Sequence, residues 1–389
     1  MKLVVVGLGQ CGGRIADQFA RIGIRALARR KVQIITGTFA VNTDEADLTG
    51  LKTVRTDYQH RIVLGGRKTS GHGVGKINEV GAQIAREGGD RVVDAVRASK
   101  RFYETDAFLL IAGAAGGTGS GGLPVITEFI KQRYEDKPVY AMVVLPFEHE
   151  EHTEERSIYN TATCLKSTFS VADAVFLVDN QRYLHKTPIK KIEQINQRIV
   201  EPFYNILCAG EEKKRKYIGG KVVDAGDIIQ TLGGWSAIGF GRSQGSMLRN
   251  PFASKRHFRK QGTETHIGIH TMDQALGELS IACKPQDARS AIYLLTSPAK
   301  EANVDIVKEI GDYLKEQAGE AVIRSGDYPR ERSGINLTLI LSKLSDVEKV
   351  THYYRRATEF APTTKERQQE AEAKLKEMAE ASKDIPTLL

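Results

Sequence analysis

Short runs of consecutive apolar residues alternate along the chain with longer segments in which apolar residues recur three or four positions apart. The clearest runs in the first half are Leu3–Val6, Ala107–Ile111, Val139–Leu145 and Ala174–Val178. Runs of this kind are typical of strands in a parallel sheet that is covered on both faces. Helical spacing follows the first run from about Arg14 to Arg30. A second strand is expected within residues 32–41. The first half therefore predicts a Rossmann-like α/β domain with a mostly parallel sheet.

The second half changes to an α+β pattern after a long amphipathic segment over residues 189–207. Its wide apolar stripe predicts a central helix buried between two domains. The later elements are expected as a strand at 237–241, a loop to residue 270, helices at 272–282 and 304–317, and strands at 291–295, 321–323 and 335–341. We predict domains over 1–186 and 211–360, the central helix over 187–210, and a charged helical tail over 361–389.

A glycine-dense segment, residues 112–124, lies between the apolar run ending at Ile111 and a helical pattern that starts near Val125. Glycine lets successive backbone N–H groups converge on an anion, and a helix start adds its own free donors. We therefore predict a phosphate cradle. Its candidate residues are Ala114, Ala115, Gly116, Gly117, Thr118, Gly119, Ser120 and Gly121. The nearest match to a Walker A loop, residues 71–77, has Ile77 where a hydroxyl is required.

A second glycine turn, residues 7–13, follows the first strand and contains Gly-x-Gly-x-x-Gly. A dinucleotide site would also need an acidic residue about 20 positions further on, at the end of the second strand. Residues 28–32 read Ala-Arg-Arg-Lys-Val, and the second strand ends in Asn42-Thr43-Asp44. An NAD-dependent oxidoreductase therefore remains only an alternative.

Composition limits the classes of partner. The chain has 389 residues, 41% of them hydrophobic, and a formal net charge of +8, which suits anionic ligands. Its four cysteines are widely spaced and predict a reducing compartment, so we expect a cytoplasmic protein. With one tryptophan and no aromatic-basic motif, we expect no nucleic-acid partner, and no apolar run is long enough for a transmembrane segment. His149 and His152 lack a ligand spacing, so no metal site made by side chains is expected.

The glycine segment resembles the Gly-Gly-Gly-Thr-Gly-Ser/Thr-Gly signature of the tubulin/FtsZ superfamily, with Ala115 in place of the first glycine. The chain is most similar to CetZ, the archaeal branch. Gly9-Gln10-Cys11-Gly12 is similar to the first nucleotide loop of tubulin, and residues 42–44 are similar to the next loop of FtsZ. This resemblance covers about residues 1–345. It implies the tubulin/FtsZ fold and binding of GTP or GDP, with Mg²⁺ held by phosphates and water.

The resemblance also assigns roles to individual residues. Residues 64–81 are similar to the FtsZ loop that closes on the γ-phosphate, the loop after residue 147 would meet the ribose, and two asparagines would read guanine. An amide can accept from the N–H groups of guanine and donate to its O6. Ile192 replaces the usual base-stacking aromatic residue. The further candidates are Gly9, Gln10, Cys11, Gly12, Gly13, Asn42, Asp44, Gly71, Gly73, Gly75, Glu150, Arg156, Asn180 and Asn196.

Residues 221–229 resemble the FtsZ loop that enters the nucleotide site of the next subunit. Asp224 and Asp227 would orient or polarise the attacking water on a neighbour's γ-phosphate; a simple capping pair is the alternative. Such head-to-tail contact builds open filaments of the chain with itself. Val222 replaces the usual asparagine, which leaves a non-hydrolysing, GTP-regulated scaffold as another alternative. The CetZ resemblance favours a role in cell shape over a division role of the FtsZ type.

Two charged segments of the second half, residues 242–270 and 364–383, carry the remaining hypotheses. The loop expected over 242–270 corresponds by position to a lateral contact of tubulin and would bind an acidic face of a neighbouring filament. Its basic residues are Arg249, Lys255, Arg256, Arg259 and Lys260. Residues 364–383 are expected to form an exposed helix with charge pairs.

Overall fold

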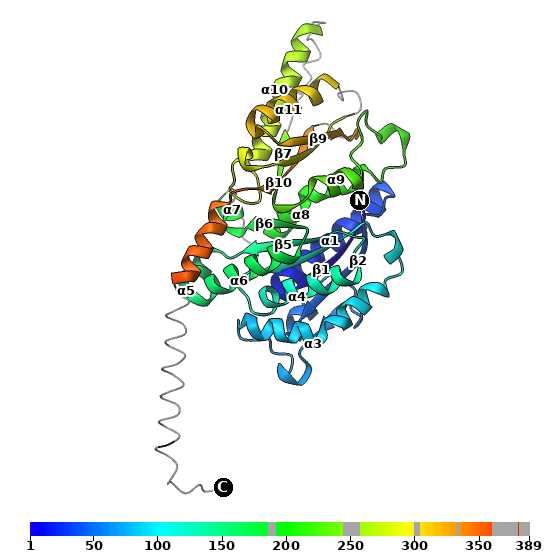
Figure 1. Ribbon diagram of the computed structural model, residues 1–389. Helices are drawn as coiled ribbons and strands as arrows, with labels where there is room; N and C mark the ends of the chain where they lie inside the picture. The colour runs from blue at the N-terminus through cyan, green and yellow to red at the C-terminus, as the bar shows by residue number, and fades with distance from the viewer. Residues whose placement is uncertain (186–191, 244–256, 299–303, 332–333, 360–379, 381–389) are drawn as a thin grey trace.

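A single ten-stranded sheet organises the computed structural model, which describes residues 1–185, 192–243, 257–298, 304–331, 334–359 and 380 (Figure 1). The strand order is β3-β2-β1-β4-β5-β6-β7-β10-β8-β9. The strands are β1 Leu3–Leu8, β2 Ile35–Asn42, β3 Arg61–Val63, β4 Ala107–Gly113, β5 Val139–Leu145, β6 Ala174–Asp179, β7 Gly234–Ser243, β8 Ser290–Thr296, β9 Val322–Asp327 and β10 Ile335–Leu344. Every pairing is parallel except those of β10 with β7 and β8, which confirms the mostly parallel mixed sheet.

Helices cover both faces of this sheet. They are α1 Gly9–Arg30, α2 Glu45–Thr49, α3 Asn78–Arg97, α4 Thr118–Arg133, α5 Glu148–Thr153, α6 Glu155–Val171, α7 Asn180–His185, α8 Ile192–Ala209, α9 Ala225–Thr231, α10 His257–Gly277 and α11 Val304–Ala318. A further helix spans residues 348–359. No helix in the described part of the chain is both long and apolar enough to cross a bilayer.

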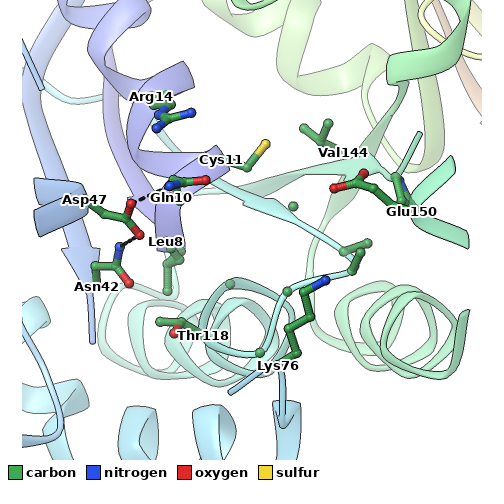
Figure 2. A pocket seen from close by; sticks show the side chains of 18 of the residues that line it. Leu8, Gln10, Cys11, Arg14, Asn42, Asp47, Lys76, Thr118, Val144 and Glu150 are labelled. Atoms are coloured by element: carbon green, nitrogen blue, oxygen red, sulfur yellow. Dashed lines mark hydrogen bonds between the residues drawn. The ribbon is translucent and has the colours of Figure 1, made fainter. Parts of the chain in front are cut away.

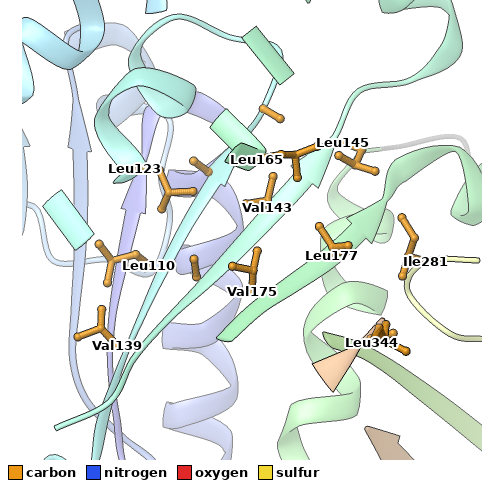
Figure 3. Packing of buried hydrophobic residues seen from close by; sticks show 14 of the residues in the cluster. Leu110, Leu123, Val139, Val143, Leu145, Leu165, Val175, Leu177, Ile281 and Leu344 are labelled. Carbon is orange, nitrogen blue, oxygen red and sulfur yellow. The ribbon is translucent and has the colours of Figure 1, made fainter. Parts of the chain in front are cut away.

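The core has two layers because successive side chains of a strand point to opposite faces. On one face, Leu110 of β4, Val143 of β5 and Leu177 of β6 pack with α4 and α6, which contribute Leu123 and Leu165 (Figure 3). On the other face, the intervening strand residues pack against α1 and α8. The apolar runs of the sequence are therefore buried on both sides, as their lack of alternation predicts.

The central helix α8 links the two halves. Its buried side chains share one hydrophobic cluster with α1, with the first strands and with Ile238, Ile292 and Ile340 of the later strands. The sheet itself is also continuous, because β6 pairs with β7 from Ala174↔Gly234 to Phe176↔Ser236. The strands β1–β6 and the second half of the chain are thus joined both by hydrogen bonds and by a shared core.

Several expected boundaries were wrong. The first helix begins at Gly9 rather than near Arg14, and α4 begins at Thr118 rather than near Val125. The segment after residue 147, expected as a loop, forms α5, and Glu151 within it is buried. Beyond Ser243, the expected loop is helical from His257, and α10 ends at Gly277 instead of extending to residue 282. The tail hypothesis for residues 364–383 falls outside the described residues except for residue 380.

Close packing explains why the two helices start early, although glycine is a poor helix former. A Cβ atom on Gly12 would lie 2.1 Å from the carbonyl oxygen of Ile111, and one on Gly121 would lie 2.0 Å from that of Asn78. Glycine at these positions lets α1 approach β4 and lets α4 cross α3. Residues that the sequence associates with ligand binding are thus required by helix packing.

Replacing Gly121 with alanine is expected to lower the free energy of unfolding by about 1–3 kcal/mol, because the new methyl group overlaps the Asn78 carbonyl. Urea denaturation measures this change. Gly277→Ala is the matched control, since a Cβ atom there meets nothing within 4 Å. Equal stability of both variants and the wild type would contradict the packing role of Gly121.

Candidate functional site

A pocket opens at the carboxyl ends of the parallel strands, where the chain order around the sheet reverses. From β1, the chain goes to β2 on one side and returns to β4 on the other, so β1 and β4 form the switch point at which open α/β sheets bind ligands. The pocket is lined by residues that follow β1, β2, β4, β5 and β6 and by residues of α8. Figure 2 shows these side chains converging from separate elements.

Two helix starts face this pocket. Neither α1 nor α4 has a side-chain cap or an acidic residue in its first turn. The backbone donors and the positive ends of both helix dipoles are therefore available to an anion. A Cβ atom on Gly116 would meet nothing within 4 Å, so the pocket leaves space over this part of the glycine segment. The arrangement fits a phosphate group.

The two glycine turns touch each other. Gly9 has a φ of +69°, and a Cβ atom on it would lie 3.0 Å from the backbone nitrogen of Gly119. In return, a Cβ atom on Gly119 would lie 2.9 Å from the carbonyl oxygen of Leu8. Side chains at either position would push the helix starts apart, so this contact keeps both sets of donors in one pocket.

A hydrogen-bonded loop after β2 forms one wall. The side-chain amide of Asn42 accepts from the backbone of Thr43 at 2.8 Å and donates to Asp47 at 3.0 Å. Gln10 also donates to Asp47, and both bonds are drawn in Figure 2. The hydroxyls of Thr43 and Thr118 lie 2.6 Å apart, so this wall is fastened to the start of α4. A carboxylate and an amide thus face the pocket in fixed positions.

The loop of residues 71–76 is hydrogen-bonded to this wall. The backbone nitrogen of Gly73 donates to Thr43, and that of Glu45 donates to Gly71, each at 3.2 Å. Lys76 lines the pocket, and its ammonium lies 2.6 Å from Glu154. Asn160 of α6 donates to the carbonyls of Lys76 at 2.8 Å and Ala115 at 3.0 Å, which ties this loop to the glycine segment.

The opposite wall combines amides with apolar side chains. Asn180 follows β6, and Asn196, only 5% exposed, lies on α8. Phe147 and Ile192 line the pocket beside them. Glu150 accepts from the backbone nitrogen of Phe147 at 2.9 Å and so stabilises the start of α5. The apolar side chains of this wall can contact the face of a planar ring, and its amides can form hydrogen bonds with the ring's edge.

Most of the expected site residues meet at this pocket. Those that line it are Gly9, Gln10, Cys11, Asn42, Asp44, Gly73, Ala114, Ala115, Gly116, Gly117, Thr118, Gly119, Glu150, Asn180 and Asn196. Those outside its lining are Gly12, Gly13, Gly71, Gly75, Ser120, Gly121 and Arg156. The Ser120 hydroxyl donates back to the Gly116 carbonyl. Arg156 pairs with Glu79 and donates to the Lys76 carbonyl, so it holds the loop rather than facing the pocket.

Sequence reasoning missed Arg14, Asp47 and Phe147, which also line the pocket. Arg14 lies one helical turn after Gln10 and could have been found by extending α1 back to the glycine turn. Asp47 lies three residues after Asp44, whose side chain caps α2. Phe147 carries no local signal, since its place depends on the fold of α5.

Asp224 and Asp227 lie at the other end of α8. Asp224 caps α9 by accepting from the backbone of Asp227 at 2.9 Å, and Asp227 lies 3.6 Å from Arg324. A Cβ atom on Gly210, just after α8, would lie 2.9 Å from the Cα atom of Asp224. Helical rise puts the pocket residue Asn196 and the end of α8 roughly 20 Å apart. Within one chain, these carboxylates are therefore remote from the pocket.

Among the described residues, no group of three or more His, Cys, Asp or Glu side chains is arranged to hold a metal ion. The pocket does contain isolated oxygen donors, Asp44, Asp47 and Gln10, on the side of the glycine turns. Hard cations such as Mg²⁺ prefer oxygen ligands and usually keep several waters. The donor set therefore fits a cation that a bound phosphate brings with it.

Comparison with known proteins identifies two matching families. The model of the tubulin/FtsZ family GTPase domain matches residues 2–187, and the model of the tubulin-like CetZ C-terminal domain matches residues 189–359. Tubulin-like protein CetZ1 of Haloferax volcanii is 33% identical over 346 residues, which cover 85% of this chain and 84% of the relative.

Two solved structures from the same organism are similar over nearly the whole chain. One is a GDP-bound monomer of CetZ1, with a TM-score of 0.75 and 29% identity, covering 92% of this chain and 99% of its own. The other is a GTPγS-bound protofilament of CetZ2, with a TM-score of 0.79 and 26% identity, covering 94% of this chain and 100% of its own.

Cys11 is expected to be a poor nucleophile although it lines the pocket. Burial, with help from Glu150, raises the pKa of its thiol to about 12, so the thiolate is a minor form at pH 8. Iodoacetamide should alkylate Cys11 of the folded protein about a hundredfold or more slowly than the urea-unfolded chain. Its rate should rise with pH without a plateau below pH 10. Mass spectrometry of the Cys11 peptide measures both, and a plateau near pH 8 would contradict the raised pKa.

Proposed function

The chain belongs to the tubulin/FtsZ family, in its CetZ branch, and we propose that it is a self-assembling GTPase of the cytoskeleton. The observation that carries this proposal is that the pocket and the acidic pair lie at opposite ends of α8. A pocket with two free helix starts and two asparagines lies at one end, and a pair of carboxylates lies at the other. Two copies placed head to tail bring these ends together, and such a contact repeats into an open filament.

The pocket accounts for each part of a guanine nucleotide. The helix starts of α1 and α4 hold the phosphates, and the loop of residues 71–76 adds the ammonium of Lys76. Asn180 and Asn196 read the base through amide hydrogen bonds, while Phe147 and Ile192 supply apolar contact. Glu150 accepts from the ribose hydroxyls. A GDP-bound CetZ1 and a GTPγS-bound CetZ2 are among the similar structures, which supports this ligand class.

Mg²⁺ would be held by the phosphates and water, with the oxygen atoms of Gln10 and Asp47 on the same side of the pocket. When bound, the ion neutralises phosphate charge. Asn42 donates to one carboxylate oxygen of Asp47, and Gln10 donates to the other. These two bonds fix the orientation of the Asp47 carboxylate.

Hydrolysis requires a second copy. In an isolated chain, Asp224 and Asp227 lie near the far end of α8, away from that chain's own pocket. In a filament, Asp224 or Asp227 of the next copy accepts a proton from, or orients, the water that attacks the γ-phosphate. The exposed segment of residues 220–222, in which Val222 is 43% exposed, precedes this pair and provides contact surface. The similar GTPγS-bound protofilament of CetZ2 supports self-association of the chain.

The cellular assignment follows the family. We propose a cytoplasmic filament that acts in cell shape, as opposed to an FtsZ-type division role. Lateral association through the basic residues of 242–270 stays a hypothesis, because Arg249, Lys255 and Arg256 fall outside the described residues and the side chains of Arg259 and Lys260 are not described.

The oxidoreductase alternative loses support at the end of β2. A ribose-binding carboxylate is needed there, but β2 ends at Asn42, whose side chain accepts from the backbone of Thr43 and Asp44. The non-hydrolysing scaffold keeps one supporting observation, namely the valine at position 222. Turnover measurements distinguish it from a GTPase.

GTP hydrolysis per molecule is expected to rise steeply with protein concentration, because the catalytic acids come from a neighbour. Asp224→Asn and Asp227→Asn keep a capping amide at α9 but remove the carboxylate, so each should lower turnover about a hundredfold while GTP binding stays within about twofold of wild type. Phosphate release and equilibrium binding measure the two quantities. Glu320→Gln, an exposed acid of the second domain, is the control.

A rate per molecule that stays flat with concentration and does not respond to either substitution would rule out the shared site. GTP binding and filament formation with no hydrolysis at any concentration would favour the scaffold.

A further inference from the structure

The helix of residues 348–359, although it follows the last strand of the second domain, lies against the nucleotide-side domain. In Figure 1 this orange helix runs beside α7 and α5. The hydroxyl of Tyr353 donates to Glu151, and the ammonium of Lys349 lies 2.9 Å from Asp179. Arg356 adds a second charge 3.5 Å from Glu151. Three contacts therefore join the end of the second domain to two carboxylates of the first.

Both carboxylates are nearly removed from water. Glu151 is 8% exposed, Asp179 is 6% exposed and Tyr353 is fully buried. Burial and the neighbouring Glu151 raise the pKa of Tyr353 far above its usual value, so the phenol remains a hydrogen-bond donor. Buried charges require partners, and removal of one partner costs much more than at the surface. These contacts consequently constrain the position of the elements that carry the carboxylates.

Each carboxylate is next to a pocket residue in the chain. Glu151 follows Glu150 on α5, and Asp179 precedes Asn180 at the end of β6. Helix α5 has only six residues, too few for stability on its own, so tertiary contacts must set its position. Asp179 also accepts from the backbone of Gln181 at 3.0 Å, which shapes the turn that presents Asn180.

The second domain supports the same turn from another direction. The guanidinium of Arg182 on α7 donates to the carbonyl of Leu279 at 2.9 Å, and the backbone nitrogen of Asp179 donates to Ser280 at 2.8 Å. The phosphate side of the pocket is built differently, from contacts between the two glycine turns and the loop after β2. The contacts of the 348–359 helix described above thus involve neighbours of Glu150 and Asn180, on the wall proposed to meet the base and ribose.

We propose that Tyr353 and Lys349 are positioning residues for guanine recognition, acting through Glu151 and Asp179 on the wall that carries Glu150 and Asn180. This role rests on the proposed GTP binding and adds a structural route by which the second domain determines nucleotide selectivity. Displacement of the helix loosens the base wall and leaves the phosphate cradle intact.

The test compares Tyr353→Phe and Lys349→Met with wild type at protein concentrations below assembly. Tyr353→Phe removes one hydroxyl, and Tyr354→Phe removes one from the next position of the same helix as a matched control. Titration with fluorescent GTP, and competition with GDP and ATP, give the affinities. Tyr353→Phe and Lys349→Met should each bind GTP about tenfold more weakly and lose most of the preference for GTP over ATP, with the GTP-to-GDP affinity ratio unchanged. The Tyr354→Phe control should bind as the wild type does. Lys349→Arg should restore binding.

Wild-type affinity and selectivity in both variants would overturn the positioning role alone. An equal loss for GTP and ATP, matched by the Tyr354→Phe control or by a fall in melting temperature, would also overturn it, because that pattern reflects general destabilisation. Failure of the wild type to bind GTP would overturn the proposed function and this inference together.

Discussion

The approach of two glycine turns at the switch point of the sheet is the constraint on which the rest of the site depends. Gly9 and Gly119 come so close that a side chain on either would meet backbone atoms of the other turn. The strands β1 and β4 are adjacent and parallel, so the helices that follow them start side by side. Two sets of unpaired N–H groups then point into one space, and an anion is the partner that satisfies them. Every other wall of the pocket is arranged around this pair.

The length of α8 separates the pocket from the acidic pair Asp224 and Asp227. Asn196 and Ile192 belong to the pocket, whereas the chain after Ala209 packs against the acidic pair. A helix of this length is a rigid spacer, and the buried cluster it shares with α1 and the later strands holds it in place. A single chain therefore keeps its pocket and this pair of carboxylates apart. Under the proposed function, assembly is a condition of turnover, which would link the chemical step to the state of the filament.

Local sequence patterns predicted the elements whose burial is uniform. The apolar runs of β1, β4, β5 and β6 are buried throughout, and the glycine turns lie where strand and helix patterns meet. Helix starts were predicted less well, because the glycines at 12 and 121 lower helix propensity but permit packing that outweighs it. Phe147 and Tyr353 gave no signal, since their partners depend on tertiary structure. Tyr353 is more than 200 positions from Glu151, and no local pattern encodes such a contact.

Complementation between two inactive chains tests the shared site most directly. One chain carries Asp224→Asn and Asp227→Asn. The other carries Gly116→Leu, designed to block the cradle at a position where a Cβ atom would meet nothing within 4 Å. A site formed by two copies predicts that each chain alone is inactive and that an equal mixture recovers about a quarter of wild-type GTP turnover, the share of random contacts that pair an intact pocket with intact carboxylates. A mixture that co-sediments as joint filaments but stays inactive would contradict the account.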